Sequence, residues 1–380
     1  MSAWCRFARL VLCLLITTNI CFTAYARSLD SSNALRLKKL ETYSHVTAVA
    51  IYNWNEDTEI DNRQIVSMLD SAGIQNDDSS EGIIFRHLLA TGTANETVKP
   101  RLPIYVKHPL LKEHWEELKV LNAKLFSAAK AYYIYARAVN DFDGSAQRIT
   151  TTVPALRRLK LEALDTGDRV ATAIASIWLS MELTLASPIQ AINEIEYALA
   201  YLPTRSSTLS LENALDSSTA HQWLRVSYTE LSVPSRAYFH SMKVIEERNR
   251  NDEFVTWAYF TAVDSLLLQG KYEDALLISD KALESVKSRN LEHETYLTLY
   301  QRLRLLVTGS RQTHKHEIKT TIELAEIIGS QVYKKDGSSA VTKIFQALRI
   351  AVNDELAVVE QFPKQEGRQM VMMVVPKRKS

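Results

Sequence analysis

Aromatic and arginine side chains between residues 220 and 305 are the best candidates for recognition chemistry in this sequence. Such side chains commonly anchor protein- and peptide-binding surfaces, because they bury a large area and offer directed hydrogen bonds. We predict as ligand- or partner-binding residues Trp223, Arg225, Tyr228, Trp257, Tyr259, Tyr296, Tyr300, Arg302 and Arg304. For each residue taken singly, and notably for Trp257 and Tyr259, a place in the hydrophobic core is the alternative.

Patterns typical of metal sites are weak. His314 and His316, with Glu317 beside them, are two residues apart, so on a helix they point to different faces, and a solvated polar turn is the favoured interpretation. The acidic turn that begins at Asp141 superficially resembles a calcium loop. Its twelfth position is Thr152 rather than an acidic residue, so we predict no metal.

Patterns typical of enzymes are also missing from the sequence. It contains no Gly-x-Ser-x-Gly elbow, no phosphate-binding loop, no His-Glu-x-x-His motif and no Gly-x-Gly. We therefore expect no cofactor, and we expect a protein that binds or senses something rather than one that catalyses a reaction.

Residues 1–26 have the pattern of a signal peptide. Arg6 and Arg9 give a cationic start, an apolar run follows from Leu10 to Ile20, and residues 24–26 form a small-x-small cleavage site. A retained membrane anchor is the alternative, but the run is shorter than the roughly 20 apolar residues of a spanning helix. We expect cleavage before Arg27, a periplasmic or secreted protein, and no membrane span after signal removal.

All three cysteines lie in this segment, at Cys5, Cys13 and Cys21. A chain that begins at Arg27 would therefore have no thiol, which excludes disulfides, cysteine metal ligands and cysteine nucleophiles from it. Lipidation of Cys21 remains a minor alternative, because Asn19-Ile20 precedes it where small residues would be expected.

The composition favours long helices and a binding partner other than nucleic acid. The chain has 45 basic and 44 acidic residues, so no basic field would attract nucleic acid. Its 10 glycines and 9 prolines are few for 380 residues, which suits helices joined by short turns and argues against a multi-strand barrel or sandwich. A protein or peptide is the expected partner; the oligomeric state is left open.

Residues 27–109 are predicted to form a small, mixed and mostly helical module. Helix-like segments at Ala34–Trp54, Asp61–Ser71 and Glu81–Ala90 are separated by polar or proline-bearing stretches. The stretch His45–Trp54 could equally be a strand, because it contains Val46, Val49 and Ile51.

Helical periodicity strengthens from residue 110 onward. Leu110–Asn140 has apolar residues at spacings of three and four and predicts one long amphipathic helix. Further helices are expected in this region, at 153–164, 168–186, 220–233, 234–250, 296–307 and 317–333.

Two segments of this region share the spacing of small residues. Ala191 and Ala198 are seven residues apart, and so are Ala275 and Ala282, which follow the turn Gly270-Lys271. These residues resemble the second helix of a tetratricopeptide repeat, strongly for residues 256–289 and fairly for 172–205; ordinary helix packing is the alternative. The resemblance implies an all-α fold, in which residues 110–333 form a solenoid of four or five helical hairpins whose concave face binds a partner.

The combination of a signal peptide with divergent helical repeats resembles the periplasmic sensory region of bacterial membrane signalling proteins, including the diguanylate-cyclase type. Those proteins continue into a membrane helix and a catalytic domain. This sequence shows no second apolar run of spanning length and no Gly-Gly-Asp/Glu-Glu-Phe signature. The resemblance therefore implies a stand-alone or truncated sensor.

Residues 334–380 carry a different resemblance. The run Ile344–Leu356, together with Gly367-Arg368 and the strand-like Met370–Val375, looks like part of the bacterial small-subunit ribosomal RNA cytosine methyltransferases. The periodicity also predicts an amphipathic helix over Val341–Gln361, which could cap the solenoid. The glycine turn for adenosylmethionine is missing, so the preferred interpretation is a joined segment without activity. A methyltransferase-related protein that uses adenosylmethionine is the alternative.

Overall fold

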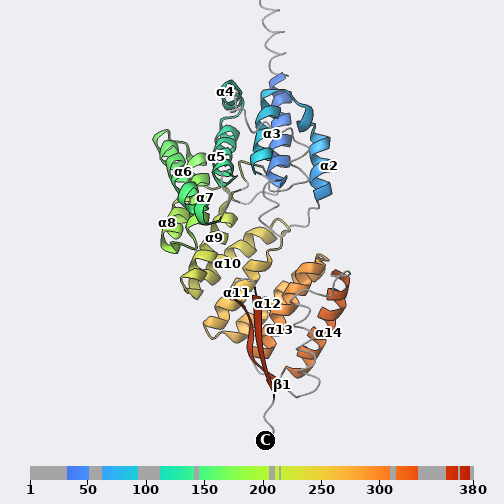
Figure 1. Cartoon of the computed structure of the whole chain (residues 1–380). Helices are drawn as coiled ribbons and strands as arrows, with labels where there is room; N and C mark the ends of the chain where they lie inside the picture. Colours follow the sequence, from blue (N-terminus) through green and yellow to red (C-terminus); the bar gives the residue numbers. More distant parts are fainter. Residues whose placement is uncertain are drawn as a thin grey trace, which may run out of the picture. The chain divides into compact units, whose positions relative to one another are not determined.

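The structure is a computed structural model, and it is almost entirely helical (Figure 1). The chain divides into two compact units, residues 1–183 with 196–216, and residues 184–195 with 217–380. The residues whose placement is described are 32–50, 62–92, 112–140, 145–204, 210–213, 215–308, 314–332, 357–366 and 369–376. The predicted signal peptide, residues 1–26, lies outside them.

The first unit begins with a helix over residues 32–50. It continues with α2 (Asn62–Ala72), the short 3₁₀ helix η1 (Ile74–Asn76) and α3 (Ser80–Gly92). The helix predictions for this module are confirmed where residues are described. The strand alternative is wrong for residues 45–50, because these residues continue the helix and bury Val46 and Val49 on its inner face.

The long helix predicted over Leu110–Asn140 is two helices, α4 (Lys112–Leu121) and α5 (Ala123–Asn140). Asn122 separates them. Its Oδ1 accepts a hydrogen bond from the Leu125 amide at 3.0 Å, the contact of a helix N-cap, so a new helix starts here. Two further helices, α6 (Ser145–Asp165) and α7 (Arg169–Leu183), pack on each other and on α5. The helix α8 (Pro188–Leu199) has residues in both units.

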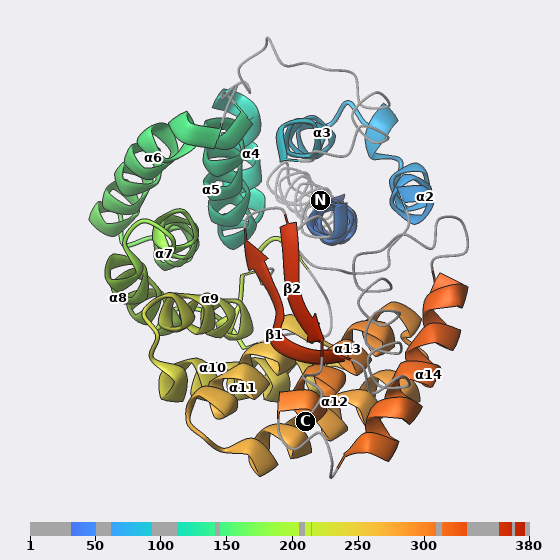
Figure 2. The same cartoon turned by 60° about the horizontal axis from the view of Figure 1, so that its bottom comes forward.

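The second unit contains three consecutive helical hairpins. They are α9 (Ser217–Glu230) with α10 (Pro234–Asn249), α11 (Thr256–Leu268) with α12 (Tyr272–Ser288), and α13 (Glu292–Thr308) with α14 (Lys315–Val332). Each helix packs on the next along the chain, and α11 also contacts α9 and α13 (Figure 2). The first helices of the hairpins therefore form one row.

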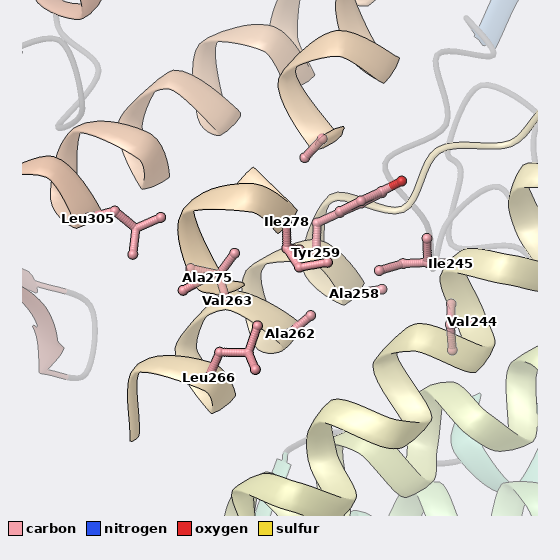
Figure 3. Packing of buried hydrophobic residues seen from close by; sticks show 11 residues of the cluster. Val244, Ile245, Ala258, Tyr259, Ala262, Val263, Leu266, Ala275, Ile278 and Leu305 are labelled. Atoms are coloured by element: carbon pink, nitrogen blue, oxygen red, sulfur yellow. The ribbon is translucent and has the colours of Figure 1, made fainter. Parts of the chain in front are cut away.

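Small residues allow these helices to approach closely. Ala258 and Ala262 of α11 and Ala275 and Ala282 of α12 are completely buried in one hydrophobic cluster, part of which Figure 3 shows. The turn between these helices contains Gly270 at φ 72°, the left-handed conformation that ends many helices. Ala275 and Ala282, which are seven residues apart on α12, are both fully buried.

Near the C-terminus the structure has a two-stranded antiparallel hairpin, β1 (Ala357–Glu366) and β2 (Gln369–Pro376). The strand predicted at Met370–Val375 is confirmed. The helix predicted over Val341–Gln361 is wrong for 357–361, where Val358 and Val359 pair with Val375 and Val374. Valine favours strands, and Pro363 lacks the amide that a continuing helix would need. Residues 341–356 lie outside the described part.

Candidate partner-binding surface

Polar side chains join the first helices of the three hairpins directly. Arg225 on α9 donates from Nη1 to the carbonyl oxygen of Trp257 on α11 at 3.3 Å, and it also contacts the hydroxyl of Thr261. Gln301 on α13 donates from Nε2 to the carbonyl oxygen of Phe260 at 3.0 Å. These bonds fix α9 and α13 to the same central helix, α11, and so hold the row in one register.

A third link is the ion pair between Arg304 on α13 and Asp264 on α11. Burial lowers the pKa of Arg304, and it lowers the pKa of Arg225 to about 10. With a pKa of about 10, Arg225 still keeps its charge at neutral pH. The two predicted anchors Arg225 and Arg304 thus bind neighbouring helices in this structure.

Arg302 lies on another side of α13. It pairs with Asp280 on α12 and with Glu317 on α14, its Nη2 lying 3.4 Å from the Glu317 carboxylate. Burial lowers its pKa, and Glu317 opposes that shift. Residues two apart on a helix point about 200° apart. The structure therefore does not bring Arg302 to the surface that carries Arg304.

The predicted tyrosines are mostly packed. Tyr259 is 5% exposed and Tyr296 is 1% exposed, so both take the core positions that were the alternative interpretation. Tyr300 is half-buried against the α13–α14 core, and burial raises its pKa to about 12. Tyr228 is half-buried and stacks on His240 of α10, with ring centroids 5.4 Å apart.

Trp257 is the predicted residue that the structure leaves most open, because 52% of it is exposed. Its ring meets the ring of Phe260 edge-on, with centroids 5.6 Å apart. Trp223 on α9 is half-buried. An exposed tryptophan held against a second aromatic ring is a typical anchor for a protein or peptide partner.

Sequence reasoning missed Phe260 and Leu297, two half-buried residues on the helices that carry Trp257 and Tyr300. The bonds of Gln301 and Arg304 place α13 parallel to α11, so that Leu297 and Tyr300 lie level with Trp257 and Phe260. Both pairs have the spacing i, i+3, which would have indicated one helix face. We use the name first-helix surface for these four residues, Trp257, Phe260, Leu297 and Tyr300.

The side chains that the sequence offered as metal ligands are not gathered into a site in the described ranges. No group of three or more His, Cys, Asp or Glu side chains in the described ranges could hold a metal ion. His314 Nδ1 lies 3.5 Å from Glu317, while His316 is exposed. The acidic turn at 141–144 lies outside the described residues. Among the helices described, none is long and apolar enough to cross a membrane.

Comparison with known proteins places a resemblance at the C-terminal end. A family described as the MraW methylase family matches residues 301–372. The ribosomal RNA small subunit methyltransferase H of Elusimicrobium minutum is 50% identical over 48 residues, which is 13% of this chain and 16% of that protein. Its counterpart in Rhodospirillum centenum is 58% identical over 45 residues, or 12% and 14%.

The C-terminal segment resembles part of a methyltransferase. This confirms the resemblance expected from Ile344–Leu356 and Gly367-Arg368. The chain spans about one-sixth of the length of the relatives it matches. The family match also begins earlier than expected, within α13, so it includes the later half of α13 and all of α14.

Proposed function

We propose that this protein is an exported helical-repeat scaffold or sensor module that binds a protein or peptide through the first-helix surface. One observation carries the proposal. Trp257 stands half exposed on a row of helices whose mutual positions are fixed by Arg225, Gln301 and Arg304. A rigid platform with an exposed aromatic anchor loses little conformational entropy when a partner binds.

The assignment of the hairpins to the tetratricopeptide type is part of this proposal. Its support is the burial of small residues where two helices of a hairpin meet, at Ala275 and Ala282, and the row formed by the first helices. In solenoids of this kind each hairpin buries its apolar stripe on its neighbours, and the row of first helices serves as the binding wall.

Export is the other part of the proposal, and it rests on the sequence of residues 1–26 alone. Fusing these residues to alkaline phosphatase, which is active only outside the reducing cytoplasm, tests it in a bacterial host. We expect full phosphatase activity and a cleaved product whose N-terminus directly follows Ala26. An uncleaved, inactive fusion would contradict export without affecting the binding surface.

Binding can be tested on the purified chain 27–380 by selecting peptides from a displayed random library and measuring their affinities by calorimetry. We expect Trp257→Ala to weaken binding of the selected peptides at least about tenfold, because exposed tryptophans are frequent hot spots. Hydrogen–deuterium exchange should then show protection in α11 and α13.

The matched control is Leu277→Ala on α12, since Leu277 is similarly exposed, at 53%. This change should leave the affinity unaltered. Equal losses in the two variants, or protection confined to the second helices of the hairpins, would refute the proposed surface.

The match to the MraW methylase family over residues 301–372 supports a second candidate, a methyltransferase-related protein that uses adenosylmethionine. Calorimetry of the chain 27–380 with adenosylmethionine separates the two. Saturable binding favours this candidate, whereas its absence, together with peptide binding that depends on Trp257, favours the scaffold.

A further inference from the structure

Two histidines face each other inside the α9–α10 hairpin. Nδ1 of His221 on α9 lies 3.1 Å from Nδ1 of His240 on α10, and the two rings stack with centroids 5.2 Å apart. His240 is 7% exposed. Its ring also stacks against Tyr228 at 5.4 Å, and Phe239 meets its edge at 5.0 Å. The pair is therefore part of the packing that joins the two helices.

This geometry accommodates only one proton between the facing nitrogens. A neutral imidazole has one N–H donor and one acceptor nitrogen, so one ring donates its Nδ1 proton and the other accepts it. When both rings are protonated, every ring nitrogen is a donor. Two N–H groups would then face each other at hydrogen-bonding distance, and two positive charges would share a buried site.

The charged groups near the pair do not compensate such a double charge. Glu247 on α10 favours protonation of His221, while Lys243 on the same helix opposes it. Arg236 and His221 both oppose protonation of His240. On α11, which also packs against this hairpin, the charged residue is Asp264, and it pairs with Arg304. Glu247 itself accepts a hydrogen bond from Ser217 at 2.6 Å.

We propose that the His221–His240 pair is a proton-sensitive contact, which holds α9 on α10 while it carries a single shared proton and releases the hairpin when both rings become charged. The effect would extend beyond the hairpin. Arg225 on α9 is bonded to α11, so displacement of α9 would also loosen the row of first helices.

The direction of the pH effect follows from burial. Burial lowers the pKa of His221 and, aided by the charges of His221 and Arg236, lowers the pKa of His240 to about 4. An unfolded chain has histidine pKa values near 6.5. Between pH 6.5 and about pH 4 the unfolded state therefore binds more protons than the folded state. The stability that this contact contributes is complete above pH 6.5 and is lost as the pH falls toward about 4.

The test is hydrogen–deuterium exchange and thermal melting of the chain 27–380 at pH 7.5 and pH 4.5. In the native sequence we expect the drop from pH 7.5 to pH 4.5 to speed up amide exchange in α9 and α10. After correction for intrinsic exchange rates, this increase should be larger than the increase in α13 and α14. His240→Phe keeps an aromatic ring against Tyr228 but removes the titrating nitrogen. This variant should lose most of the extra pH-dependent exchange. The exposed His316→Gln is the control and should retain it.

Nuclear magnetic resonance of the native chain keeps the proposal testable if His240→Phe fails to fold. The ring protons of His240 should keep their neutral-form shifts down to pH 5. Titration of His240 near pH 6.5, or equal acid sensitivity of His240→Phe and His316→Gln, would overturn the proposal.

Discussion

Arg86 in the first unit and Arg225 in the second are both buried, and they bind different kinds of structure. In the first unit, Arg86 on α3 donates to the carbonyl oxygens of Ile74, Gln75 and Asp77, at 3.1, 3.2 and 2.6 Å. It therefore fixes an irregular connection that lies 9 to 12 residues earlier in the chain. In the second unit, Arg225 binds Trp257 and Thr261 on α11, which lie 32 and 36 positions later in the chain.

This difference shows how the two regions are specified. The connection around η1 has few regular backbone hydrogen bonds, so a side chain must satisfy its carbonyl groups. The hairpins of the second unit satisfy their backbone internally, and a side chain is needed only to set how neighbouring hairpins stack. Arginine is suited to both tasks because its guanidinium group carries five N–H donors.

The largest expected effect is that of Arg86→Met. The change removes the guanidinium donor from the carbonyl oxygens of Gln75 and Asp77, whereas Ile74 also accepts from the Asp77 amide. One unsatisfied buried acceptor costs about 1–3 kcal/mol. We expect the first unit to lose at least about 3 kcal/mol of stability, measured by native-state hydrogen exchange in α3. The second unit should be unaffected. Retention of full protection in α3 would show that water can replace the guanidinium group.

Arg225→Met should have the next largest effect, a loss of about 1–3 kcal/mol, because one carbonyl and one hydroxyl group lose their donor. The loss should appear in the exchange of α9 and α11 amides. Arg304→Met is the matched change on the same row, and it should cost less than about 1 kcal/mol because its ion pair with Asp264 is partly exposed. Equal costs would contradict the distinction between buried and surface links.

Tyr43→Phe should have a smaller and pH-dependent effect. Burial alone would raise the pKa of Asp77, but hydrogen bonds from Tyr43, Ser79 and Lys39 outweigh it and lower the pKa to about 2. Asp77 therefore contributes stability above pH 3.8 that is lost as the pH falls toward about 2. Removing the Tyr43 hydroxyl should cost about 1 kcal/mol at neutral pH.

The difference between Tyr43→Phe and the native protein should shrink between pH 4 and pH 2, as followed by urea denaturation. A difference that stays constant over this range would mean that the Tyr43 hydroxyl acts independently of the Asp77 charge.

The smallest expected effect on stability is that of Trp257→Ala, because half of this side chain is already exposed. We expect a change below about 1 kcal/mol in thermal melting. A larger loss would mean that Trp257 belongs to the core. The peptide-binding measurement would then be repeated with a milder substitution, Trp257→Phe.

The helices could be predicted from sequence because apolar residues recur at helical spacing and because Pro188 and Pro234 stand at helix starts. The break at Asn122 was missed, since the spacing continues through it and only the side-chain cap reveals a new start. The strand that begins at Ala357 depends on pairing with β2, which no local pattern reports.

The candidate surface was predicted less well than the fold. Trp257 was recognised, but Tyr259 and Tyr296 were included because composition alone does not show which face of a helix is buried. Arg302 and Arg304 could have been separated by helix geometry, which places neighbours two apart on different sides. The roles of Arg86 and Gln301 depend on contacts between distant segments, so the sequence contained no signal for them.

Arg225, Gln301 and Arg304 each skip a helix and bind across to α11. The hairpin α11–α12 therefore supplies acceptors to both of its neighbours, at Trp257, Phe260 and Asp264. Excising this hairpin would remove the partners of all three side chains at once, although arrays built from equivalent repeats commonly tolerate the loss of a unit. The order of these hairpins is thus fixed by individual residues, which restricts how such a chain can lengthen or shorten during evolution.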